Sequence, residues 1–501
     1  MKHPVVLSML AAALLPLPAA AQGYRARLDT RFQSVAFRGV QLDSVPAADV
    51  VTGPDGGLFS PDGFAVQCLT GQPFCTFFRP GAELRAAPVT TTADVTVWGL
   101  GVPGLTARGK VRVGADLGDG ARWPGTDPAV HLLEGYAEWA SPVLTAHVGR
   151  TNVFTRFGFT GFDGAKVEVR PLADYVRLSA WGGWGLARGV ALPVTSDALN
   201  PLDDFQPRDR QLVAGARLGW TVDRLDGSFT YQREVDPASD LFVSERIALE
   251  GALTPFGGLV VSGGADYDLS FGYWGTAEGS IRYAHPSGIG RVRVGARRYR
   301  PHFDLWTIWG AFSPTPYRAV SGAAAVTPVR GLDLRGSAEV YEYDETGADT
   351  PLARFVDDGW RWAVGATVTR LERWTLTGEY HAEQGPGAGA IGFETAATYQ
   401  FDETLAATAR LGTLKRPLEF RVDDASVWVF GLRIDYHPVD QVRLNLELQQ
   451  YDETRRRPDA ARFEWNQFRL HAGMTLTLGS GADARSLHPA ILAIPEAPVT
   501  R

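Results

Sequence analysis

Charged residues recur at every second position in several segments of this chain. The basic ones are Arg25, Arg27 and Arg31, then Arg108, Lys110 and Arg112, and then Arg291, Arg293 and Arg297. The acidic ones are Glu134, Glu138, Asp266, Asp268, Glu278, Glu339, Glu379 and Glu383. A spacing of two places such residues on one face of a β-strand. Because so many charges cannot be buried in a dry core, we predict that they line a water-filled space.

The charged residues that line this space have two possible roles. Opposed basic and acidic surfaces would create a transverse field that favours hydrated, polar solutes. Alternatively, acids and bases pair across neighbouring strands and stiffen the wall without selecting any solute.

Residues suited to catalysis or metal binding form no defined motif. His131, His147, His381 and His471 are scattered, and neither a G-x-S-x-G nor an H-E-x-x-H pattern occurs. Gly99 to Gly104 match a dinucleotide-binding glycine pattern, but Pro103 predicts a turn between two strands. The acidic pair Asp203–Asp204 has poor spacing for a calcium loop. We expect no catalytic residue, no metal and no cofactor, with a hydrolase site assembled from distant segments as an alternative.

The two cysteines, Cys68 and Cys75, lie close together in one loop. In an oxidising, exported compartment two such cysteines form a disulfide that closes a small surface loop. No histidine lies near enough in sequence to complete a tetrahedral metal site with them.

The segments that must position the charges have an apolar second face. Over residues 105–117 Leu105, Ala107, Val111 and Val113 alternate with polar residues, and over 442–449 Val442, Leu444, Leu446 and Leu448 do the same. Segments of about ten residues with this alternation have the length of a tilted membrane strand.

Short turns alternate with longer polar loops along the chain. The short turns include residues 102–104, 141–142, 171–174, 255–257, 285–288, 328–331 and 437–440, and the loops include 185–211, 300–315, 344–358, 413–426 and 451–462. This asymmetry is typical of bacterial barrels, with short periplasmic turns and long extracellular loops. We predict an all-β, antiparallel, up-and-down transmembrane barrel of about 22 strands, with 18–22 as the range.

The last strand carries a more specific pattern. His471, Gly473, Leu476 and Leu478 occupy the polar, glycine and two hydrophobic places of the signal in the last strand of Gram-negative outer-membrane barrels. The chain therefore resembles a porin-like protein of the outer membrane. The resemblance implies contact with outer-membrane lipid, insertion by the barrel-assembly machinery and passive passage of polar small molecules. A homotrimer is an assembly that it leaves open.

The remaining segments define the expected organisation. Residues 1–21 have the polar start, apolar run and Ala19-Ala20-Ala21 site of a signal peptide. Residues 22–478 would form the barrel, without an N-terminal plug domain, and 479–501 a periplasmic tail. Residues 39–88 form the longest irregular stretch, an extracellular loop that we expect either to narrow the pore or to shield its surface.

Composition agrees with this organisation. The chain is 45% hydrophobic with 56 Gly and 14 Trp, yet its mean hydropathy is only −0.10, because apolar and polar residues alternate. The net charge of −7 gives no support for nucleic-acid binding. The leading hypothesis is a passive channel for polar solutes that is not an enzyme. An export conduit or scaffold that docks a periplasmic partner through the tail, and a barrel-wall hydrolase, are the alternatives.

Overall fold

The computed structural model describes residues 23–53, 57–118, 129–172, 175–186, 211–237, 242–300, 316–344, 357–385, 388–419, 423–457 and 465–480. The predicted signal peptide and nearly all of the predicted tail lie outside these residues, as do most of the loops at 185–211, 300–315 and 344–358. No helix in the described ranges has the length and apolar character needed to cross a membrane.

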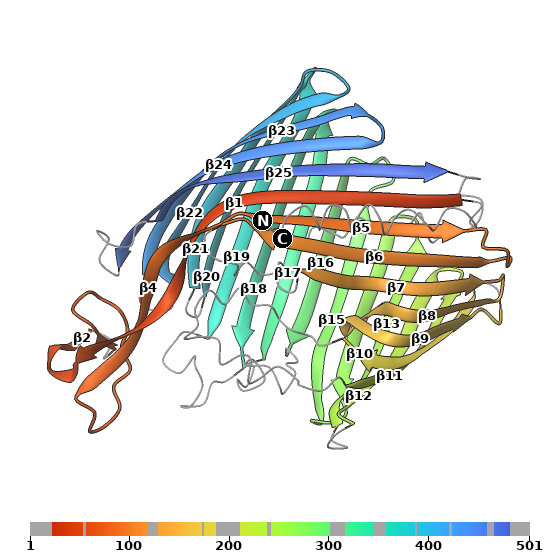
Figure 1. Ribbon diagram of the computed structural model, residues 1–501, viewed down its shortest axis with the longest axis horizontal. Coiled ribbons are helices and arrows are strands. Elements are labelled where there is room, and N and C mark those ends of the chain that lie inside the picture. Colours follow the sequence, from red (N-terminus) through yellow and green to blue (C-terminus); the bar gives the residue numbers. More distant parts are fainter. Residues whose placement is uncertain are drawn as a thin grey trace.

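The described chain is almost entirely β-strand (Figure 1). The first part contains β1 (Gly23–Pro46), the 3-10 helix η1 (Ala47–Asp49), β2 (Val51–Thr52), β3 (Leu58–Phe59), β4 (Phe74–Ala86), β5 (Pro88–Trp98), β6 (Leu105–Asp116), β7 (Val130–Ala140), β8 (Leu144–Thr155), β9 (Gly158–Val169), β10 (Val176–Gly185), β11 (Leu212–Val222) and β12 (Leu225–Val235). The second part contains β13 (Phe242–Phe256), β14 (Leu259–Asp268), β15 (Tyr273–Ala284), β16 (Gly290–Tyr299), β17 (Tyr317–Val329), β18 (Leu332–Tyr343), β19 (Asp358–Leu371), β20 (Trp374–Gly385), β21 (Ala388–Gln400), β22 (Leu405–Glu419), β23 (Asp423–Val439), β24 (Val442–Arg457) and β25 (Trp465–Ser480).

The sheet closes on itself through its first strand. β1 pairs with β25 from Tyr24↔Ser480 to Ser34↔Leu470, and its same half pairs with β5 from Gly23↔Trp98 to Phe32↔Val89. The described sheet has 23 strands, and all of them except β4 belong to the closed ring. The prediction of an antiparallel barrel of about 22 strands is therefore confirmed, and the four residues of the predicted assembly signal lie on β25, the strand that closes it.

Alternation along the strands separates an inner from an outer face. On β16, Arg293 and Arg297 line the interior cavity described below, whereas the intervening Val294 is 55% exposed. Exposed Val320 on β17 and Val340 on β18 continue this outer apolar surface. An exposed apolar band with polar residues inside is the arrangement that a membrane barrel requires.

The connections are asymmetric, as the sequence predicts. The strand ends near Gly23 and Ser480 share one side with the short connections, which include residues 223–224, 257–258 and 330–331. The glycine-rich segment 99–104 is one of these turns, between β5 and β6. On the opposite side two loops are shorter than expected. β22 and β23 extend into the predicted loop 413–426, and β24 extends into 451–462, because their alternating residues continue to pair beyond the wall.

The predicted irregular stretch 39–88 is largely regular, which corrects that interpretation. β1 and β4 pair from Val35↔Ala86 to Pro46↔Phe74, with one register shift, and we call residues 35–86 the outer ribbon. Its tip contains β2, β3, and a cluster of Val45, Phe64, Cys75 and Phe77. The predicted disulfide Cys68–Cys75 is present there. The outer ribbon projects beyond the neighbouring strands, with β2 at its far end (Figure 1).

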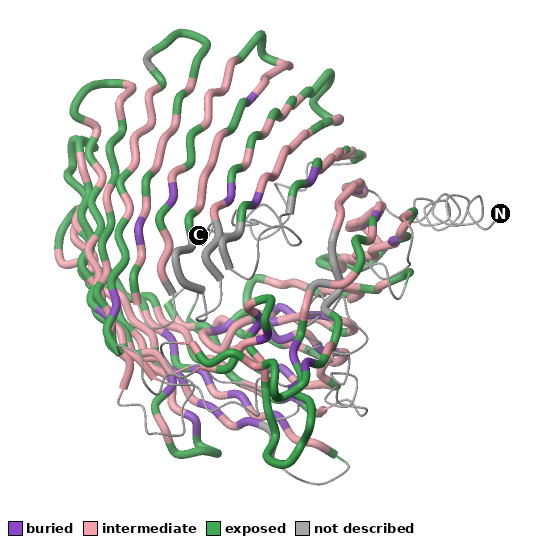
Figure 2. Tube along the Cα trace, turned by 90° about the vertical axis from the view of Figure 1, so that its left-hand side faces the viewer, coloured by how far each residue is buried: buried purple, intermediate pink, exposed green. Residues whose placement is uncertain are grey.

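Buried residues gather in one sector of the barrel. Figure 2 shows most of the wall as intermediate or exposed, with purple segments concentrated in the lower part of the view. About half of the buried side chains of the described residues belong to β8–β13, including Phe162, Trp181, Val213, Thr230 and Gln232. The wall is therefore thicker here than a single sheet, because part of the chain folds against its inner face.

Candidate functional site

The barrel interior holds a cavity of about 1150 Å³. Its walls come from β8–β20 and carry seven basic and seven acidic side chains, together with many glycines, alanines and serines. Small residues between the charged ones leave room in the lumen. A cavity with this lining can accommodate hydrated, polar molecules.

One hairpin leaves the wall and enters this interior. β8 pairs with β7 only from Ala140↔Thr145 to Gly135↔Arg150, although it remains paired with β9 as far as Thr155↔Gly158. On the other side, the pairing of β9 with β10 ends at Phe162↔Gly185. We call residues 151–162 the inner hairpin, because they pair with each other beyond the point where the pairing of β8 with β7 ends. At its base Phe162 pairs with Gly185, and the carbonyl oxygen of Gly161 accepts a hydrogen bond from the backbone of Leu186 over 2.8 Å.

Glycines permit the bend at its base. Gly149 has φ +129°, and a Cβ there would stand 2.3 Å from the carbonyl oxygen of Gly135. A Cβ on its β9 partner Gly164 would stand 2.1 Å from the carbonyl oxygen of Gly182. Such close backbone contact is open to glycine alone, so these residues let β8 and β9 turn away from the wall.

The two faces of the inner hairpin differ. Thr151, Val153, Thr155, Thr160 and Phe162 are buried, and Gln232 of β12 donates a hydrogen bond to the Thr160 hydroxyl over 3.3 Å. The opposite face carries the cross-strand pair Phe154 and Phe159, which are 76% and 60% exposed. The buried face, with its threonines and with Val153 and Phe162 clustered against Trp181 and Val213, therefore packs against the wall, and the other face presents aromatic rings.

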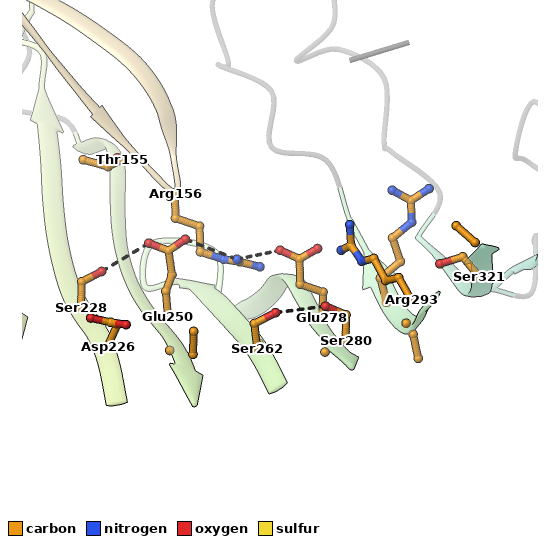
Figure 3. Close-up of a pocket in the computed structure, with 18 of the residues that line it drawn as sticks. Thr155, Arg156, Asp226, Ser228, Glu250, Ser262, Glu278, Ser280, Arg293 and Ser321 are labelled. Carbon is orange, nitrogen blue, oxygen red and sulfur yellow. Dashed lines mark hydrogen bonds and ion pairs between the residues drawn. The ribbon is translucent and has the colours of Figure 1, made fainter. Parts of the chain in front are cut away.

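Arg156 at the tip connects the inner hairpin to β13, β14 and β15, which are not its neighbours. Figure 3 shows its side chain between Glu250 and Glu278. Its guanidinium donates to Glu278 on β15 over 3.0 Å and to Asp266 on β14 over 3.3 Å, and lies 3.8 Å from Glu250 on β13. It also donates to the carbonyl oxygens of Gly264 and Thr276. Only 9% of this side chain is exposed. A planar guanidinium has enough donors for all these acceptors, which a lysine lacks.

A second charge cluster occupies the adjoining wall. Glu339 on β18 accepts hydrogen bonds from Arg297 on β16 over 3.0 Å and from Arg361 on β19 over 2.6 Å. On the same wall Arg335 pairs with Glu379 at 2.8 Å. Cross-strand pairing, the second interpretation of the charged residues, therefore accounts for many of them.

The predicted lumen-lining residues fall into two groups. Glu278, Arg293, Arg297 and Glu379 line the cavity, and Asp266 contacts Arg156 at its edge. Asp268 is buried and accepts backbone hydrogen bonds from Ser270 and Phe271, so it stabilises the turn after β14. Arg291 lies nearer the short turn of β16 and outside the cavity lining.

The other group lies on the strands near the closure of the barrel. Arg25, Arg27 and Arg31 are on β1, where Arg27 pairs with Asp29 at 2.9 Å. Arg108, Lys110 and Arg112 are on β6, where Arg108 pairs with Asp94 at 2.7 Å and with Glu134 at 3.5 Å. Glu138 on β7 lies 3.3 Å from His147 on β8. The structure keeps this group apart from the cavity lining, and a role in the pore wall stays a prediction for it.

Sequence reasoning missed Arg156, Glu250 and Arg361. Arg156 was hidden because it does not belong to an alternating run of charges. One signal could have revealed it: β8 and β9 are joined by only two residues on the side where long loops were expected. A short connection there indicates a hairpin with its own role.

Within the described residues no group of three or more His, Cys, Asp or Glu side chains could hold a metal ion.

No protein-family model and no curated protein matches this chain. Similar solved structures include OccK1 (OpdK) of Pseudomonas aeruginosa, with 10% identity, coverage of 91% of this chain and 99% of that one, and a TM-score of 0.39. OccK2 (OpdF) of the same species has 10% identity, coverage of 91% and 98%, and a TM-score of 0.40. A BenF-like porin of Pseudomonas fluorescens Pf-5 has 11% identity, coverage of 91% and 99%, and a TM-score of 0.39. Likeness at this level does not transfer a function to this chain.

Proposed function

We propose that this chain is a passive channel of the outer membrane for small polar solutes. The observation that carries the proposal is the charged cavity of about 1150 Å³ inside a closed barrel with an apolar outer face. Water and dissolved solutes stabilise such an interior, and lipid stabilises such an exterior.

The inner hairpin gives the channel its narrow region. It reaches from β8–β9 to β13–β15 and is held there by Arg156. In the outer ribbon, by contrast, Val45, Phe64, Cys75 and Phe77 pack against one another. We therefore assign the narrowing to the inner hairpin in place of the loop 39–88.

The expected partners follow from this proposal. The outer valines and aromatic residues would contact lipid, and the barrel-assembly machinery would engage β25 through His471, Gly473, Leu476 and Leu478. Solutes would pass by diffusion, without an enzymatic step. A homotrimer stays a prediction from the sequence.

Single-channel conductance of the refolded mature protein in a planar bilayer tests the proposal. We expect steady openings of one defined size. Protein that shows the circular dichroism of a β-barrel and inserts into the bilayer, yet conducts no ions, would contradict it.

A further inference from the structure

Four tyrosines form a continuous aromatic surface on three neighbouring strands. Tyr299 on β16 stands opposite Tyr317 on β17, which stands opposite Tyr343 on β18, with ring centroids 5.2 and 5.4 Å apart. Tyr341 lies 6.2 Å from Tyr317 and 6.0 Å from Tyr343. We call these four residues the tyrosine row.

The tyrosine row faces the lumen. Its members alternate along their strands with Val320 and Val340, which are exposed on the outer face. They share a face with Arg297, Ser321 and Glu339, which line the cavity. The rings are therefore on the side that a solute would meet.

Glycines let the ring of Tyr341 lie flat on the wall. A Cβ on Gly359 of β19 would fall 2.4 Å from this ring, and a Cβ on Gly385 of β20 would fall 2.1 Å from its hydroxyl oxygen. The ring thus covers the backbone of two strands, an arrangement known from aromatic residues that cover glycines in sheets. A ring with one face on the backbone offers its other face to the lumen.

Polar groups border the tyrosine row. The guanidinium of Arg297 lies 5.3 Å from the ring centroid of Tyr317, and the Tyr341 hydroxyl donates to Glu383 over 3.3 Å. Glu339 accepts hydrogen bonds from Arg297 and Arg361. The border thus contains two guanidiniums, those of Arg297 and Arg361, and two carboxylates, those of Glu339 and Glu383, and their formal charges cancel. The border therefore offers many donors and acceptors without a strong preference for an ion of either sign.

The tyrosine row is close to the narrow region. Arg297 stands directly opposite Glu278, which accepts a hydrogen bond from Arg156 of the inner hairpin. A solute that passes the tip of the hairpin would therefore pass close to the aromatic surface.

We infer that the tyrosine row binds the pyranose rings of neutral carbohydrates on their way through the channel. A pyranose has an apolar C–H face, which packs on an aromatic ring, and hydroxyl groups around its edge, which exchange hydrogen bonds with guanidiniums and carboxylates. A solute that carries a carboxylate on an aromatic ring could also stack on tyrosines, but it would need a guanidinium with no acid beside it. Arg297 and Arg361 both pair with Glu339, so the site favours a neutral solute. The inference rests on the proposed channel function.

Current blockade by maltotriose in a planar bilayer tests the inference. We expect transient blockades of the open channel, and none with a polyethylene glycol of similar size. In the double variant Tyr317→Leu/Tyr341→Leu the blockades should shorten about tenfold, the equivalent of one or two aromatic contacts. Tyr341→Phe should keep most of the blockade time because the ring remains.

Tyr380→Leu on β20 is the matched control, because Tyr380 packs against Trp362 on the outer face. It should leave the blockades unchanged. Conducting channels that maltotriose does not block would overturn the inference while the channel function stands, whereas silent channels would contradict the channel itself. Equal maltotriose blockade times in the wild type and the double variant would also overturn the inference. So would channels that benzoate blocks and maltotriose does not.

Discussion

Two segments of this barrel leave the wall, and they do so in opposite ways. The outer ribbon extends beyond the neighbouring strands and packs four apolar side chains into a cluster of its own, closed by Cys68–Cys75. The inner hairpin buries three threonines, Val153 and Phe162 against the wall of the barrel, and the arginine at its tip pairs with carboxylates on β13–β15.

The difference shows what directs such a segment. Apolar side chains that can pack against one another make a tip self-sufficient, so it needs no support from the barrel. Threonine hydroxyls and a guanidinium need hydrogen-bond partners, and the inner wall provides them: Gln232 donates to Thr160, and Asp266 and Glu278 accept from Arg156. A polar tip is thus stabilised inside a polar lumen.

Blocking the bend of the inner hairpin should have the largest effect. Gly149→Ala puts a Cβ against the Gly135 carbonyl oxygen and forces an alanine into a backbone conformation of positive φ. We expect a loss of about 3 kcal/mol or more in the free energy of unfolding in lipid vesicles. Gly109→Ala on β6, where an added Cβ meets no atom within 4 Å, is the control and should cost much less.

Removing the tip contact should come next. Arg156→Ala leaves Asp266 and Glu278 without this guanidinium, and it should weaken the attachment of the inner hairpin by about 1–3 kcal/mol, since Glu278 is partly exposed. Single-channel recordings should show a higher and noisier open conductance, with Arg156→Lys intermediate because lysine has fewer donors. Arg373→Ala, in the short turn between β19 and β20 where the side chain donates to the carbonyl oxygen of Phe401, should conduct like wild type. Unchanged conductance in Arg156→Ala would contradict the assignment of the narrow region of the channel to the inner hairpin.

Opening the disulfide should have the smallest effect on the channel. Cys68→Ser/Cys75→Ser should destabilise the tip of the outer ribbon by about 2 kcal/mol, seen as faster hydrogen exchange around Phe64 and Phe77. Conductance should stay the same, because the ribbon tip packs on itself. A conductance change in this variant, or on adding reductant to wild type, would place the outer ribbon over the pore and end the contrast between the two segments.

The local pattern of the sequence was sufficient for the barrel and for several of its details. Period-two alternation decides which face of each strand meets lipid, and turn residues decide where each strand ends, because both depend on residues close in the chain. The turn at 99–104, the Cys68–Cys75 bond and the positions of Arg293 and Arg297 on one face follow from such local rules.

The tertiary structure alone decided which of these residues meet. Arg156 and Glu278 are 122 positions apart, and no periodicity relates them. The tyrosine row likewise depends on the registers of β16, β17 and β18, which place Tyr299, Tyr317 and Tyr343 opposite one another. The sequence by itself determined the faces and the turns through neighbouring residues, whereas the closure of the sheet and the bend at Gly149 brought distant residues together inside the lumen.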